Sequence, residues 1–295
     1  MPHRRFASFG STFVAPAALA FTALLAVEAV AQVPGRAGRT RSDLPQHGRA
    51  QVVTVVAREY AFDLPDTLDA GVTTFRLRDA GREPHHMMLY ALDAGHSLRD
   101  VHDALTAGGA HPHWMHAVGG PNSTIGSRQS VATLDLPAGT YAVFCHIPSP
   151  DGRLHFSKGM LKSLIVRPAA AIRDRLPPPD VAITLDDYAF RLSGPLTRGY
   201  HRIAITNRGR QAHELILSRL AAGKSGHDFV HWIELQDGPP PVEPWGGTTD
   251  LAPGRTIVLD VNLEPGRYSL LCRVRDTGDG LPHDRHGMMT EVEVR

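Results

Sequence analysis

Apolar and polar residues alternate with a period of two along many short segments of this chain. Such alternation is typical of β-strands with one face in a core. It predicts strands in the first half at 51–60, 72–79, 85–92, 129–136, 140–147 and 160–167. It predicts strands in the second half at 181–190, 200–207, 213–220, 255–263, 267–274 and 288–295. One short helix is predicted in each half, at 98–107 and at 227–236. The pattern therefore predicts an all-β fold.

The two halves repeat the same residues in the same order. A tyrosine lies 25 residues before His85 and again 25 residues before His213. The segment LPAGTYAVFC, which ends at Cys145, returns as LEPGRYSLLC, which ends at Cys272. A period of about 128 residues is far too long for a solenoid repeat, so it indicates two separate sandwiches in tandem. We predict two tandem Greek-key β-sandwich domains, each with one short helix.

The chain begins with the features of an export signal. Basic residues precede an apolar run, and Ala-Val-Ala at 29–31 gives a cleavage pattern before Gln32. The run is shorter than the ~20 residues that span a membrane, so we expect no membrane insertion after cleavage and a periplasmic or secreted protein. The predicted segments are a signal peptide at 1–31, a disordered lead-in at 32–50, a first domain at 51–168, a linker at 169–178 and a second domain at 179–295.

Composition narrows the possible functions. The formal net charge is only +1, from 31 basic and 30 acidic residues, which gives no reason to expect a nucleic acid partner. The chain has 17 histidines but only 2 cysteines. Histidine and cysteine are the side chains that soft metal ions prefer, so these residues are candidate metal ligands.

Each half places a histidine, a cysteine, a second histidine and a methionine in the same order. The second histidine and the methionine always have the spacing His-x4-Met. A thiolate, two imidazoles and a weak thioether are a soft ligand set that suits copper, whereas zinc would favour a fourth strong donor. The candidate ligands are His85, Cys145, His155 and Met160 in the first half and His213, Cys272, His283 and Met288 in the second.

This order at the end of a β-sandwich resembles the cupredoxins, the plastocyanin-like and azurin-like type 1 copper proteins. The resemblance covers both halves and implies one type 1 copper ion in each, with one-electron transfer between Cu(II) and Cu(I). It also implies that His155 is the exposed ligand through which electrons enter. Small cupredoxins have a shorter loop between the cysteine and the second histidine. The type 1 site of copper nitrite reductases has a loop as long as the one here.

The sequence allows several other roles for these cysteines and the residues around them. Export would permit a disulfide between Cys145 and Cys272, although each cysteine is expected to point into its own core. Both could instead be buried thiols in domains that have lost copper. In the second half His283 competes with His286, and Arg273 places a cation next to the thiol. Met87, Met88, Met288 and Met289 give one more alternative, a methionine-rich surface that transfers copper(I).

A catalytic function is the main alternative. Two-domain nitrite reductases have a histidine directly before the copper cysteine and another five residues after the first ligand histidine; here these positions hold Phe144 and Tyr90. The remaining candidates for a further metal site are His86, His111, His113 and His146. We therefore expect no catalytic residues and predict an exported electron carrier with an unidentified redox partner protein. The alternatives are a nitrite reductase-like or oxidase-like enzyme, or a copper storage protein.

Overall fold

The computed structural model describes residue 40 and residues 50–169 and 175–295. The predicted signal peptide, nearly all of the lead-in and residues 170–174 of the linker lie outside the described residues. Within the described part, no helix is long and apolar enough to cross a membrane.

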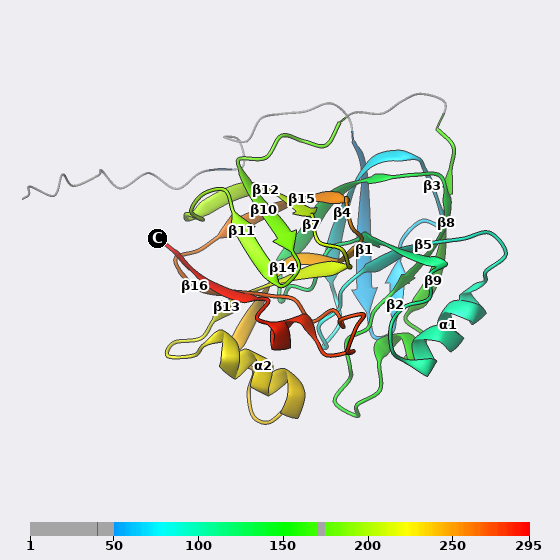
Figure 1. The fold of residues 1–295 in the computed structure, drawn as a ribbon. Helices are drawn as coiled ribbons and strands as arrows, with labels where there is room; N and C mark the ends of the chain where they lie inside the picture. Colours follow the sequence, from blue (N-terminus) through cyan, green and yellow to red (C-terminus); the bar gives the residue numbers. More distant parts are fainter. Residues whose placement is uncertain (1–39, 41–49, 170–174) are drawn as a thin grey trace, which may run out of the picture. The chain divides into compact units, whose positions relative to one another are not determined.

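The first half is a β-sandwich of two layers (Figure 1). One layer has the strand order β7-β4-β1-β2 and the other has the order β6-β5-β8-β9-β3. The strands are β1 (Gln51–Arg58), β2 (Ala61–Asp63), β3 (Thr67–Asp69), β4 (Gly71–Asp79), β5 (Met88–Leu92), β6 (Met115–Gly119), β7 (Gln129–Leu136), β8 (Gly139–Phe144) and β9 (Leu161–Arg167).

The second half repeats this arrangement. Its layers have the orders β15-β12-β10-β11 and β14-β13-β16-β17, which match the first half strand for strand except for β3. The strands are β10 (Val181–Asp186), β11 (Ala189–Leu192), β12 (Gly199–Asn207), β13 (His213–Leu220), β14 (Val242–Leu251), β15 (Thr256–Leu263), β16 (Gly266–Leu271) and β17 (Met289–Val294). Successive strands cross between the layers in the Greek-key manner, which confirms the predicted fold class.

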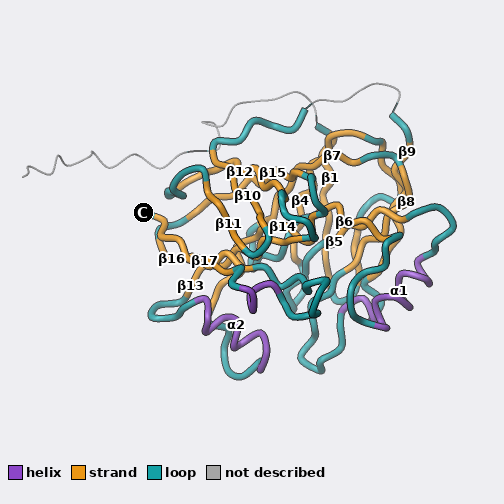
Figure 2. Tube along the Cα trace, in the orientation of Figure 1, coloured by secondary structure: helices purple, strands orange, loops and turns teal. Residues whose placement is uncertain are grey.

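Both predicted helices are present. They are α1 (Leu98–Ala107) and α2 (Gly226–Leu235), and each begins with a capping box. The Ser97 hydroxyl accepts a bond from the Asp100 amide while the Asp100 carboxylate accepts one from the Ser97 amide, which satisfies two helix-end donors. Figure 2 shows strands joined by many loops, with helix only in α1, α2 and short helical turns.

The two halves share their sheets. Strand β7 pairs with β15, and strand β6 pairs with β14 at Val118 and Leu251. The described strands consequently form one sheet of eight strands and one of nine. The guanidinium of Arg128 lies 3.8 Å from the ring centroid of Trp245, a cation–π contact across the junction. The two sandwiches are therefore joined through both of their sheets.

Strand β8 is buried on both faces. Tyr141 and Val143 point into the core of the sandwich, and Cys145, which directly follows the strand, belongs to the same cluster. Ala142 and Phe144 point the other way and pack in a second cluster under α1. Alternation correctly placed the cysteine on the core face. The opposite face is covered because the helix packs on it.

Candidate metal centres

The first three ligand candidates meet at one end of the first sandwich. His85 lies three residues before β5, Cys145 directly follows β8, and these two strands pair from Met88 and Phe144 onward. His155 begins a short helical turn (His155–Lys158). The amide of Cys145 donates to the carbonyl of Met160 at 3.2 Å, which fixes the returning chain beside the cysteine.

The donor atoms of this group face one another. Nδ1 of His85 lies 3.0 Å from Nδ1 of His155, and Sγ of Cys145 lies 3.4 Å from the same Nδ1 of His155. All three side chains are completely buried. Metal bonds of about 2.0 Å to nitrogen and 2.3 Å to sulfur place neighbouring donors roughly 3.3–3.8 Å apart, so the group is close to the span that one ion bridges.

The second half builds the same group. His213 opens β13, Cys272 directly follows β16, and His283 begins the helical turn His283–His286. The two Nδ1 atoms lie 3.0 Å apart, and Sγ of Cys272 lies 3.4 Å from Nδ1 of His283 and 3.9 Å from that of His213. His286 stays outside the group and lies 3.2 Å from Asp279.

The methionines lie beside the cysteines. Met160 and Met288 are completely buried and belong to the same apolar cluster as Cys145 and Cys272. Met288 accepts a bond through its carbonyl from the amide of Cys272 at 3.2 Å, as Met160 does from Cys145. All eight predicted ligand residues are therefore placed around two buried groups, one in each half.

Burial favours the neutral forms of both cysteines, of His85 and of His283 in the absence of a cation. It raises the pKa of the Cys145 thiol to about 12 and that of Cys272 well above its usual value. Burial, followed by the repulsion of the partner imidazole, lowers the pKa of His85 and of His283 to about 4. A bound cation offsets this cost for the thiol because it favours the thiolate. A neutral imidazole already has a lone pair for the metal, so it loses no proton to the solvent when it becomes a ligand.

Carboxylates set the proton position on one imidazole of each group. Nε2 of His155 lies 2.8 Å from Glu83, and Nε2 of His213 lies 3.0 Å from Asp187. A carboxylate accepts, so each Nε2 carries the proton and each Nδ1 presents its lone pair to the group. Burial alone would raise the pKa of Glu83, but hydrogen bonds from Ser149, His155 and Tyr60 outweigh it and lower that pKa.

His155 is not the exposed ligand that the resemblance implied. Its side chain is completely buried, with Glu83 on Nε2 and the Tyr60 ring edge-on at 5.2 Å. The expectation was wrong because Tyr60 and the helical turn cover the imidazole. The tyrosine that recurs 25 residues before each first ligand histidine was a visible signal, since Tyr188 covers His283 in the same way at 5.4 Å.

A second feature of both groups was missed. The side chain of His86 accepts a bond from the backbone amide of His146 at 2.9 Å, and Glu214 accepts one from that of Arg273 at 3.0 Å. In each half the residue after the first ligand thus bonds the residue after the cysteine. His86, a candidate for a further metal site, is half-buried and ties two ligand-bearing segments together instead.

Both groups fit a type 1 copper site. Two imidazole nitrogens, one thiol sulfur and an adjacent buried methionine are soft, polarisable donors in a dry site. The structure leaves both cysteines unpaired, each inside its own group, so no disulfide joins Cys145 to Cys272.

The positions that hold additional copper ligands in nitrite reductases have other contacts here. The Tyr90 hydroxyl donates to the buried carboxylate of Asp250 across the junction. Phe144 is completely buried, with its ring 5.4 Å from that of Tyr90. His111 lies edge-on to Tyr90 at 4.8 Å. Among the described residues, His86, His111, His113 and His146 do not converge into a group that one ion could bridge.

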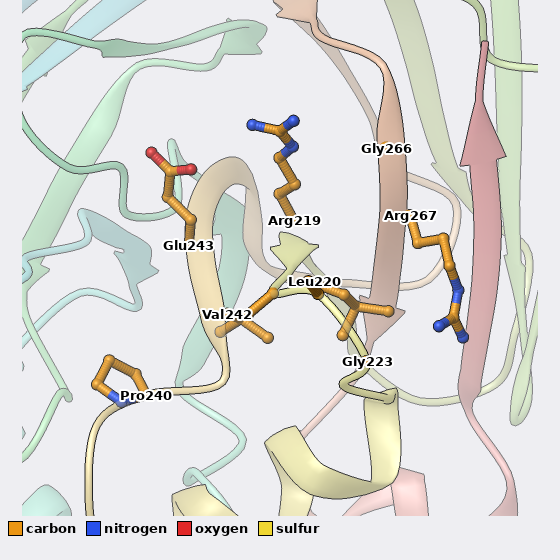
Figure 3. Close-up of a pocket in the computed structure, with 10 residues that line it drawn as sticks. Arg219, Leu220, Gly223, Pro240, Val242, Glu243, Gly266 and Arg267 are labelled. Atoms are coloured by element: carbon orange, nitrogen blue, oxygen red, sulfur yellow. The ribbon is translucent and has the colours of Figure 1, made fainter.

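A surface hollow of about 540 Å³ lies elsewhere, at the far end of β13 from His213 (Figure 3). Neither histidine nor cysteine lines it, so it offers no soft metal donors. The lining residues are Arg219, Leu220, Ala221, Ala222, Gly223, Pro240, Val242, Glu243, Gly266 and Arg267.

Comparisons with known proteins give structural likenesses only. No family model matches the chain, and no curated protein is significantly similar to it in sequence. Auracyanin A of Chloroflexus aurantiacus, described as a blue copper protein, is 22% identical over 40% of this chain and all of its own, with a TM-score of 0.30. An auracyanin of Roseiflexus castenholzii is 17% identical over 41% of this chain and all of its own, with a TM-score of 0.29.

A copper-containing nitrite reductase of Thermus scotoductus is similar over a longer stretch. It is 13% identical over 84% of this chain and 62% of its own, with a TM-score of 0.25. Scores this low support no functional assignment, which must come from the side chains.

Proposed function

We propose that this protein is an exported electron carrier that holds one type 1 copper ion in each half. The observation that carries this proposal is the pair of buried thiol–imidazole groups with matching donor distances, 3.0 Å between imidazoles and 3.4 Å from sulfur to the second imidazole. Bound copper would supply a one-electron Cu(II)/Cu(I) couple. His85, Cys145 and His155 would hold it in the first half, and His213, Cys272 and His283 in the second.

The protein itself would hold the ligands rigidly and exclude water from them. Backbone bonds tie the cysteine segment to the second histidine in each half, with the amide of Phe156 donating to the carbonyl of Cys145 at 2.9 Å. Donors already close together need little movement when a metal charge changes. The covering rings of Tyr60 and Tyr188 keep water from the imidazoles. A redox partner protein in the periplasm or outside the cell completes the proposed role.

Redox cycling separates an electron carrier from a copper storage protein. Protein loaded with Cu(II) should be reduced by ascorbate and reoxidised by ferricyanide through repeated cycles while it keeps two copper ions per chain. Copper content after each desalting step is the measurement. Loss of copper upon reduction would favour storage or delivery over electron transfer.

Replacing Met160 with leucine should shift the reduction potential of the first centre without expelling its copper. An axial thioether is a weak, long ligand that tunes the metal more than it holds it. Spectroelectrochemistry measures the potential. Met88→Leu is the matched control, because Met88 is equally buried but lies in the cluster under α1. A loss of copper in the Met160 variant would contradict the axial role.

Sustained turnover of nitrite or dioxygen should be negligible in the copper-loaded protein. Phe144 offers no ligand atom, and the hydroxyl of Tyr90 is already bonded to Asp250. Steady-state consumption with an excess electron donor is the measurement. Turnover that disappears in His146→Ala or His111→Ala would show a second kind of copper site and an enzyme.

A further inference from the structure

The two centres repeat in their ligands but differ in what touches those ligands. Two residues before the first ligand histidine the first half has Glu83, and the second half has Gln211. The surrounding segments align without a gap, from Asp79 to His85 and from Asn207 to His213. A carboxylate in one centre is thus exchanged for an amide in the other.

Glu83 contacts a ligand directly. Its Oε2 accepts from Nε2 of His155 at 2.8 Å, and its Oε1 accepts from the hydroxyl of Tyr60 at 3.0 Å. The side chain is only 22% exposed. The ammonium of Lys158 contacts this network, at 3.1 Å from the Tyr60 hydroxyl and 2.8 Å from Asp151.

Gln211 is turned away from the metal group. Its amide nitrogen donates to Asp276 at 2.6 Å and to the Tyr188 hydroxyl at 3.1 Å, and its oxygen accepts from the amide of Thr277 at 2.8 Å. Nε2 of His283 has no hydrogen-bond partner among the described residues. A carboxylate therefore bonds the second histidine directly in the first centre, whereas in the second centre Asp276 is bonded by Tyr188 and Gln211 and acts on His283 only through space.

The first histidines also differ. Asp187 bonds Nε2 of His213, whereas Glu59 lies at the corresponding place near His85 without bonding it. The carboxylates of Asp186 and Asp250 also act on His213 through space. The first centre has in addition Asp79, which accepts from the backbone amide of His85 at 3.0 Å.

The second centre has its own neighbouring charges on the cysteine side. Glu214 accepts from the amide of Arg273, and Arg273 lies 3.1 Å from Asp284. These groups include both acidic and basic side chains. None of them bonds a ligand imidazole.

We propose that Glu83 is a positioning residue that holds Nδ1 of His155 toward the metal and lowers the reduction potential of the first copper centre. This inference rests on the proposed function. A carboxylate on the outer nitrogen of a ligating imidazole fixes its tautomer and raises its basicity. Its negative charge in a site of low dielectric favours Cu(II) over Cu(I).

Glu83→Gln tests the charge while it keeps an acceptor for His155. The potential is measured in a Cys272→Ser background, so that only the first centre is observed. We expect the ratio of reduced to oxidised copper at a fixed potential to rise about tenfold, in the range of hydrogen bonds to charged groups. Asp151→Asn is the matched control, since it removes the same charge from a carboxylate that contacts Lys158 but no ligand. An unchanged potential, or an equal shift in the control, would overturn the proposal.

A measurement without copper tests the positioning role. In the metal-free protein, ¹⁵N NMR should show the proton of His155 on Nε2 in the wild type and in Glu83→Gln. Glu83→Leu should give a mixture of tautomers. A proton on Nδ1 in the wild type would refute the role. Failure of the wild type to develop a thiolate-to-copper band would refute the proposed function instead, and the tautomer result would still stand.

Discussion

Copper content should fall from two ions to one per chain when Cys145 is replaced with serine. The intense thiolate-to-copper absorption near ~600 nm should lose the contribution of the first centre and keep that of the second. The reason is that the thiolate is the one anionic ligand of the group. A serine hydroxyl in a fully buried site stays protonated and is a hard donor that copper(I) does not prefer. His85 and His155 alone would then bind the ion weakly.

The mirror variant and the double variant are the controls. Cys272→Ser should leave one copper ion per chain and the absorption of the first centre. The double variant should bind no copper with high affinity. The halves share both sheets, so far-ultraviolet circular dichroism must show that each variant is folded. Loss of both ions from a folded single variant would contradict two independent centres. Retention of both would contradict the ligand role of the cysteine.

Gly120→Ala should destabilise the protein by ~3 kcal/mol or more, the range of substitutions that force backbone atoms apart. Gly120 follows β6 with a φ of +144°, and a Cβ built there lies 2.0 Å from the carbonyl oxygen of Met87. Neither backbone can give way easily, because Gly120 accepts from the amide of Thr249 and the Thr249 hydroxyl donates to Met87. Urea unfolding of the metal-free protein is the measurement.

The effect should reach the first copper centre. Met87 lies two residues after His85, so a shift of its carbonyl displaces the first ligand and weakens copper binding there. Gly152→Ala is the control: its φ is +78°, but nothing lies within 4 Å of the added carbon. It should cost only the ~1–2 kcal/mol of a left-handed backbone. Equal stability losses in the two variants would show that the contact at Met87 is unimportant.

The repeat and the ligand candidates could be predicted because both depend on short-range spacing. A cysteine at the end of an alternating strand and His-x4-Met after a loop are visible without knowledge of the fold. Both helices, too, were predicted within one residue of their observed bounds. Their serine caps and amphipathic spacing are local signals.

Two of the four strands that join the halves, β6 and β14, could not be predicted. Strand β14 reads VEPWGGTTDL, in which glycines and a proline replace the alternation of apolar residues. Its glycines are needed where neighbouring strands approach closely: a Cβ at Gly247 would lie 1.8 Å from the carbonyl oxygen of Leu215. Strand β6 reads MHAVG, which is too short to show a clear alternation, and no strand was predicted there. Continuous sheets across the junction are therefore a tertiary property without a local pattern.

The contacts around the ligands were likewise hidden. Glu83 is separated from His155 by 72 residues, and only the fold brings the carboxylate to the imidazole. His155 was expected to be exposed because the resemblance suggested it, but the covering role of Tyr60 depends on a contact between segments far apart in sequence. Spacing identified which residues meet. It did not identify what surrounds them.

The absorption spectrum of Cu(II)-loaded protein, with copper quantified per chain, tests the central claim most directly. Two ions per chain with an intense band near ~600 nm are the expected result, since each buried cysteine would act as a thiolate ligand. Weak absorption without such a band, at any copper content, would contradict type 1 copper in this protein.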